Sequence, residues 1–181
     1  AAGTGKTTLA KVLLKELDVD DGDVMMINAS NENNVDTMRT KINGFASSLP
    51  FSGDFKYVLL DEADYLSPNA QAILRNMMET YSTTCRFILT CNYPNKVIPA
   101  IHSRCQGYHI EKLDTEEFTA RVATILITEG TDLDLDTLDI YVRSTYPDLR
   151  KCINMVQQNV VDGKLQAPGE GESGESDWIL E

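Results

Sequence analysis

The sequence opens with the stretch AAGTGKTT at residues 1–8, and apolar residues at helical spacing follow it from residue 9 to residue 17. Gly3 and Gly5 allow the backbone to turn its N–H groups inward around an anion. The N-terminus of the helix that follows carries the positive end of its dipole and favours the same anion. This arrangement predicts a phosphate-binding loop (P-loop) that leads into a helix.

The side chains of the P-loop have separate expected roles. Lys6 would reach the β- and γ-phosphates of ATP, and the hydroxyl of Thr7 would ligate Mg²⁺. The other candidates for nucleotide contacts are Gly3, Thr4, Gly5 and Thr8. The full motif is G-x-x-x-x-G-K-[ST], so its first glycine would fall one residue before Ala1. We therefore expect the sequence to be a fragment that lacks the start of this motif and the strand before it.

An acidic motif follows a strand-like apolar run at residues 55–60, which leads straight into Asp61 and Glu62. This is a Walker B arrangement, in which Asp61 would hold Mg²⁺ and Glu62 would orient and deprotonate the attacking water. The tetrapeptide at residues 61–64 also spells DEAD, a motif of RNA helicases. The rest of the chain fits that class poorly. The P-loop and the Walker B motif together predict an ATPase with ATP and Mg²⁺ as its cofactors.

Three further residues stand where they could complete an ATP site. Asn92 follows the strand pattern of residues 86–91, and an amide at a strand tip can position water and sense the γ-phosphate. Arg104, in the triplet Ser-Arg-Cys at residues 103–105, could stabilise phosphoryl-transfer charge in a neighbouring subunit, as an arginine finger does. Arg150 opens a later helix pattern and could reach the same nucleotide from the other side.

Strand and helix patterns alternate over the first 110 residues, which indicates an α/β fold with a parallel sheet and helices on both faces. The strand patterns lie at residues 24–28, 55–60, 86–91 and 107–110. The helix patterns lie at residues 6–17 and 35–46 and after the helix start Ser67-Pro68. We expect these elements to form a nucleotide-binding α/β domain at residues 1–111.

The pattern becomes helical from residue 112, where Asp114 and Glu117 form a start that resembles a capping box and Gly130 forms a stop. Two more helix patterns follow at residues 134–145 and 148–161. We expect a small all-α lid at residues 112–162. Residues 163–181 are rich in Gly, Glu and Ser and predict a flexible tail or the start of a further domain.

Composition and charge argue against several classes. The formal net charge is −12, with 12 acidic and 10 basic residues in 1–110 and 16 acidic and 6 basic residues in 111–181. This balance does not suggest a generic nucleic-acid binder, although it is compatible with a local DNA contact in the first part. No apolar run approaches the ~18 residues of a membrane span. The cysteines form no CxxC motif, so we expect free thiols, no zinc site and a cytoplasmic location.

The order and spacing of these motifs resemble those of the clamp-loader ATPases of the AAA+ superfamily, with replication factor C small subunits among them. The matching segments are the P-loop at 3–8, Walker B at 60–64, sensor 1 at 90–92, the Ser-Arg-Cys motif at 103–105 and sensor 2 at 147–151. The resemblance covers roughly residues 1–162. Details such as residues 87–92 look most like the large subunit of T4-type bacteriophage loaders, including those of cyanophages.

The resemblance implies that ATP binds between the subunits of a hetero-pentamer, which then opens a ring-shaped sliding clamp and grips primer–template DNA. Hydrolysis would release the clamp on the DNA, with Arg104 acting in trans and Arg150 in cis. Arg39 and Lys41 are candidate phosphate contacts to DNA. Cellular relatives often carry a basic residue where Asn33 stands here. The collar domain that assembles the pentamer is expected to be missing, so we expect the fragment alone to be inactive.

Two alternatives stay open. The first is another AAA+ motor of DNA metabolism, such as a helicase loader or a branch-migration ATPase. The Ser-Arg-Cys triplet and the segment Pro-Asp-Leu-Arg-Lys at residues 147–151 argue against it. The second is a nucleotide-gated scaffold that binds ATP without turnover, and the presence of both Glu62 and Arg104 argues against that.

Overall fold

The computed structural model describes residues 3–31 and 35–169, which fall into two compact units. The first unit comprises residues 6–109. The second comprises the described residues 3–5 and 110–169. Each unit has a hydrophobic core of its own, and the two cores share no residue.

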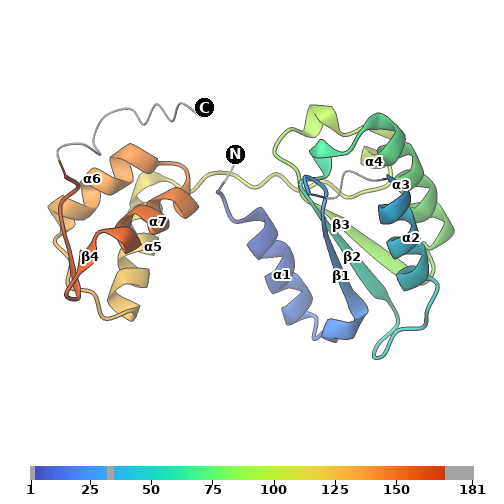
Figure 1. Cartoon of the computed structure of the whole chain (residues 1–181), viewed down its shortest axis with the longest axis horizontal. Helices are drawn as coiled ribbons and strands as arrows, with labels where there is room; N and C mark the ends of the chain where they lie inside the picture. Colours follow the sequence, from blue (N-terminus) through green and yellow to red (C-terminus); the bar gives the residue numbers. More distant parts are fainter. Residues whose placement is uncertain (1–2, 32–34, 170–181) are drawn as a thin grey trace. The chain divides into compact units, whose positions relative to one another are not determined.

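The first unit contains a three-stranded parallel sheet in the order β1-β2-β3 (Figure 1). Its strands are β1 (Val24–Asn28), β2 (Lys56–Asp61) and β3 (Cys85–Leu89). Val58, Leu59 and Leu60 of the central strand are fully buried, which is typical of a parallel strand covered on both faces. Because the strands are parallel, their carboxyl ends meet at one edge of the sheet, where Asn28 lies in register with Asp61.

The described residues of this unit form four α-helices: α1 (Lys6–Glu16), α2 (Val35–Ala46), α3 (Pro68–Thr80) and α4 (Pro99–His102). The helices α2 and α3 lie on one side of the sheet and α1 on the other (Figure 1). Ser67 caps α3 by accepting a hydrogen bond from the N–H of Ala70 at 3.2 Å, and Pro68 begins the helix. The predicted parallel α/β architecture with helices on both faces is confirmed.

In α1, Ala10 and Leu14 are buried, whereas Leu9, Val12 and Leu13, and Leu17 just after the helix, are between 47% and 56% exposed. One expectation for this unit is wrong. Residues 107–110 form no strand, because no strand in the described part of the sheet pairs with them and a lone extended segment makes no ladder.

The second unit contains three helices, as predicted: α5 (Thr115–Thr128), α6 (Leu135–Thr145) and α7 (Leu149–Gln158). Asp114 caps α5 through the N–H of Glu117 at 2.8 Å, and Gly130 follows the helix with a positive φ of 73°. The core of this unit is formed by residues from all three helices. It includes Phe118, Val122, Leu138, Tyr141 and Cys152.

A short antiparallel hairpin follows these helices and corrects the expectation of a purely helical lid; its second strand lies in the segment expected to be a flexible tail or the start of a further domain. Its strands are β4 (Val160–Val161) and β5 (Lys164–Leu165). Asp162 and Gly163 both adopt positive φ, as a tight two-residue hairpin turn requires. Leu165 is only 3% exposed and packs in the core of this unit. The rest of the expected tail beyond residue 169 lies outside the described residues.

The described residues contain no helix that is both long and apolar enough to span a membrane. All four cysteines are free thiols, as expected. Burial raises the pKa of the Cys85 thiol to about 11, so this side chain is a neutral core residue at physiological pH.

Candidate nucleotide-binding site

The P-loop helix and the end of β2 meet through a hydrogen bond between two predicted Mg²⁺ ligands. Oγ1 of Thr7, in the first turn of α1, donates to Oδ1 of Asp61 at 2.6 Å. Both residues are partly buried. Hydroxyl and carboxylate oxygens are hard ligands of the kind that Mg²⁺ prefers. The donor set and its convergence therefore fit a magnesium ion bound with a nucleotide.

The start of α1 suits an anion. Gly3 and Gly5 adopt positive φ values of 69° and 84°, a conformation that glycine tolerates without steric cost. Lys6 is the first residue of α1, and the first turn of the helix carries no acidic side chain. Thr8 lies in this turn, and Thr4 precedes the helix by two residues. The positive end of the helix dipole is thus not neutralised by an acid of its own turn, which fits a phosphate group.

Thr90 connects the two acidic residues of the Walker B motif. Its Oγ1 donates to Oδ1 of Asp61 and accepts a hydrogen bond from the backbone N–H of Glu62 at 3.1 Å. Thr90 is only 8% exposed. The sequence interpretation placed Thr90 in the sensor 1 segment but gave it no role of its own. Its position follows from the register of the sheet, which pairs Leu60 with Leu89 and places the residues that follow them side by side.

Glu62, the expected base, has a left-handed backbone with φ 57° and ψ 44°. This conformation costs a non-glycine residue free energy, and it persists only where neighbouring contacts impose it. Those contacts come from two sides. Besides the Thr90 hydroxyl bonded to Glu62, the N–H of Ala63 donates to the carbonyl of Thr90 at 2.8 Å, and the N–H of Tyr65 donates to the carbonyl of Glu62 at 3.0 Å.

Asn92 stands beside this group on a loop that Asp64 holds. The carboxylate of Asp64, which is 6% exposed, accepts hydrogen bonds from the N–H groups of Asn92 and Tyr93, both at 3.3 Å. The side-chain oxygen of Asn92 is buried and has no hydrogen-bond partner among the described residues. Buried acceptors are nearly always satisfied, so this atom suits a ligand or a water molecule. Asp64 is a second residue that the sequence interpretation placed in a motif without a role of its own.

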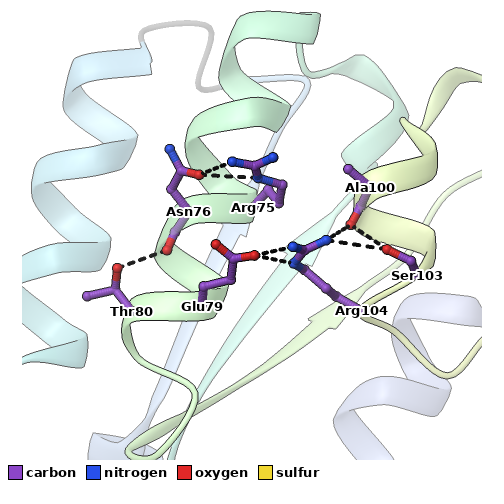
Figure 2. Close-up of polar contacts among 7 residues, drawn as sticks. All are labelled: Arg75, Asn76, Glu79, Thr80, Ala100, Ser103 and Arg104. Atoms are coloured by element: carbon purple, nitrogen blue, oxygen red, sulfur yellow. Dashed lines mark hydrogen bonds and ion pairs between the residues drawn. The ribbon is translucent and has the colours of Figure 1, made fainter.

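Arg104 makes its contacts elsewhere in the first unit. Its Nε donates to Oε1 of Glu79 at 2.8 Å, and its Nη2 contacts the same oxygen (Figure 2). Its Nη1 donates to the carbonyl of Ala100 at 2.8 Å and to Oγ of Ser103 at 3.3 Å. A residue that acts on a neighbouring subunit is not expected to touch the ATP site of its own chain.

The remaining predicted residues are exposed. Arg150 lies in the first turn of α7, which Asp148 caps through the N–H of Lys151 at 3.0 Å. Arg39 and Lys41 lie on α2, two positions apart and hence about 200° around the helix axis, so they face different directions. Asn33, at which the resemblance implies a basic residue in many cellular relatives, lies outside the described residues.

Comparisons with known proteins agree with these motifs. The family model described as "ATPase family associated with various cellular activities (AAA)" matches residues 1–112. A replication factor C small subunit of Methanococcus maripaludis is 42% identical over 159 residues, which are 86% of this chain and 50% of the relative. The corresponding protein of Methanoculleus marisnigri is 43% identical over 160 residues, which are 87% of this chain and 50% of that relative. The chain thus spans about half the length of these relatives.

Among solved structures, the RuvB Holliday junction branch migration motor of Thermotoga maritima is similar, with a TM-score of 0.71. The match covers 91% of this chain and 55% of the RuvB chain, at 13% sequence identity. At this identity the likeness concerns the fold alone.

Proposed function

We propose that this chain, which belongs to the AAA family of ATPases, is the ATPase part of a subunit of a DNA polymerase sliding-clamp loader. The identity of 42% to a protein named replication factor C small subunit supports this assignment. The sequence identity to the branch-migration motor is only 13%, so that similarity supports the fold but not a branch-migration function. The clamp loader is therefore favoured over the other AAA motors of DNA metabolism.

The observation that carries the ATPase proposal is the network of Thr7, Asp61, Thr90 and Glu62 at the carboxyl edge of the sheet. Lys6 and the N-terminus of α1 would bind the phosphates. Thr7 and Asp61 would hold Mg²⁺, which supplies neutralisation of the phosphate charge.

Glu62 would orient the attacking water and take its proton, from a position that Thr90 fixes through the backbone. The unpartnered side-chain oxygen of Asn92 would accept a hydrogen bond from the same water. Arg104 would act on the ATP of a neighbouring subunit, and Arg150 on the ATP of its own.

The partners of the assembled protein belong to the same proposal. They are the other subunits of a hetero-pentamer, a sliding clamp and primer–template DNA. The expected location is the cytoplasm. The expected source is a T4-type bacteriophage, and replication genes on either side of the coding sequence would support this source.

Arg39 and Lys41 would contact DNA phosphates. In Arg39→Ala, the slope of log DNA affinity against log salt concentration should become smaller. An unchanged slope would exclude a phosphate contact by Arg39.

The decisive test replaces Glu62 by Gln in the complete protein, assembled with its partner subunits. We expect ATP binding to be retained and hydrolysis, measured with clamp and primer–template DNA, to fall by a factor of about 10²–10⁴. Glu117→Gln, the same chemical change at an exposed lid position, is the control and should hydrolyse ATP normally. Normal turnover in Glu62→Gln would exclude Glu62 as the base. A wild-type assembly that binds ATP without turnover would favour the scaffold, and turnover without clamp loading would favour another AAA motor.

A further inference from the structure

Glu79 binds the guanidinium group of Arg104 from the side (Figure 2). Glu79 lies in the last turn of α3, and Arg104 follows α4 by two residues. One carboxylate oxygen, Oε1, accepts hydrogen bonds from both Nε and Nη2 of Arg104. The hydrogen bond from Arg104 lowers the pKa of Glu79, partly opposed by burial, and the charges of Arg104 and Arg75 lower it further. Glu79 is therefore a carboxylate at neutral pH, and the contact is charge-assisted.

The other contacts of the guanidinium are weaker in kind. Nη1 donates to the carbonyl of Ala100 at 2.8 Å and to Oγ of Ser103 at 3.3 Å, and both of these acceptors are neutral. All of these bonds have a charged donor, but only the bond to Glu79 also has a charged acceptor, and two opposite charges attract each other more strongly than a charge and a dipole. We therefore expect an approaching phosphate oxygen to displace the neutral acceptors at Nη1 before it displaces Glu79 from Nε.

The two elements that carry this pair are tied together by Gln71, a residue of α3 that is 2% exposed. Its Nε2 donates to the carbonyl of Lys96 at 2.9 Å, and its Oε1 accepts from the N–H of Ile98 at 2.8 Å. The segment that these bonds hold leads directly into α4. Glu79 therefore approaches Arg104 from a fixed position, and its carboxylate restricts the rotamers of a long, flexible side chain.

Stability alone does not account for this contact. The side chain of Glu79 is 49% exposed and that of Arg104 is 33% exposed, and ion pairs this open to solvent contribute little to folding. We propose that Glu79 is a positioning residue, which orients the guanidinium of Arg104 for entry into the ATP site of the neighbouring subunit. This inference rests on the proposed role of Arg104 as an arginine finger in trans.

The test measures ATP hydrolysis by the complete protein in its assembled oligomer. In Glu79→Ala we expect kcat to fall by about ten- to a hundredfold with KM for ATP unchanged, because a misplaced group mainly weakens the transition state. Glu79→Gln keeps an oxygen acceptor for Nε but loses the charge, so it should recover only part of the lost activity. Asp139→Ala is the matched control: it removes an exposed lid ion pair with Arg143 at 2.7 Å and should leave kcat unchanged.

A double-mutant cycle separates positioning from a general structural effect. If Glu79 acts through Arg104, Glu79→Ala has no further effect on kcat in the Arg104→Ala background. Equal losses in both backgrounds, an unchanged kcat, or a raised kcat in Glu79→Ala would each overturn the positioning role. In these cases a large loss in Arg104→Ala would leave the proposed function intact. If Arg104→Ala itself hydrolyses ATP normally, the finger assignment fails and the positioning role fails with it.

Discussion

Glu62 shows how the site imposes a costly conformation on a single residue. Its φ of 57° lies in a region that residues with a Cβ avoid, at a cost of about 1–2 kcal/mol. Bonds from Thr90 and Tyr65 hold it there. Strained backbone of this kind clusters at functional positions, where the orientation of one side chain matters more than local stability.

This strain predicts a difference between two variants that both lack the carboxylate. Glu62→Gly should be more stable to unfolding than Glu62→Ala by about 1 kcal/mol, because glycine adopts positive φ without steric cost while alanine retains the strain. Both variants should lose ATP hydrolysis. Urea denaturation, with midpoints and slopes compared, measures the difference. Equal stability of the two variants would mean that the backbone at residue 62 is not held in the left-handed region.

The sequence motifs predicted which residues meet at the site, but they did not predict the partners that support these residues. The P-loop and Walker B motifs assigned Thr7 and Asp61 to one ion; the structure brings their oxygens to 2.6 Å, and their role as its ligands stays a prediction. The roles of Thr90 and Glu79 were missed, because a supporting contact depends on the register between strands or on the packing of two helices. Neither leaves a periodic signal along the chain.

At the scale of elements, Asp23 holds the turn before β1 against the loop that leads to β2. Its fully buried carboxylate accepts hydrogen bonds from the N–H groups of Phe51 at 2.8 Å and Ser52 at 2.9 Å. Burial by itself raises the pKa of Asp23, but the N–H groups of Ser52 and Phe51 and the charge of Lys56 outweigh it and lower this pKa below its ordinary value. The folded state therefore prefers the ionised form.

A lowered folded-state pKa gives a definite sign to the dependence of stability on pH. The stabilisation by Asp23 is fully present above its unfolded pKa of about 4 and is lost as the pH falls through the lower folded value. In Asp23→Asn, an NH₂ group replaces one of the two acceptor oxygens, so a donor then faces a backbone N–H donor. We expect this variant to melt below the wild type at pH 7, with a difference that shrinks below about pH 4. Thermal melts between pH 3 and pH 7 measure it, and a difference independent of pH would exclude an ionised Asp23.

Elements with a strong internal period were predicted to within a residue or two, as the strand Val24–Asn28 and the helix Val35–Ala46 illustrate. The two errors in strand assignment share one cause. Residues 107–110 look like a strand but have no partner in the described sheet, and Lys164–Leu165 do not look like a strand but pair with Val160–Val161. Strand formation depends on a neighbour, which a local pattern does not contain.

At the scale of the whole molecule, the two separate cores mean that stability is not distributed evenly along the chain. One core lies against β1–β3 and includes Leu60 and Leu74, and the other joins α5, α6 and α7 around Leu138 and Tyr141. Compact units with their own cores commonly open as separate cooperative segments. A destabilising change in one core is therefore expected to act first on the amides of its own unit.

Leu138→Ala tests this expectation in the lid. Leu138 is fully buried, and removing a buried leucine side chain costs about 2–5 kcal/mol through lost burial and the cavity left behind. Leu135→Ala, on the same helix but at a position that is 66% exposed, is the control and should cost less than about 0.5 kcal/mol. Hydrogen exchange should show faster exchange in α5–α7 of Leu138→Ala and a smaller change in β1–β3. Equal acceleration in both units would show that the chain unfolds as one cooperative body, since a defect confined to one core would then lower the stability of every amide alike.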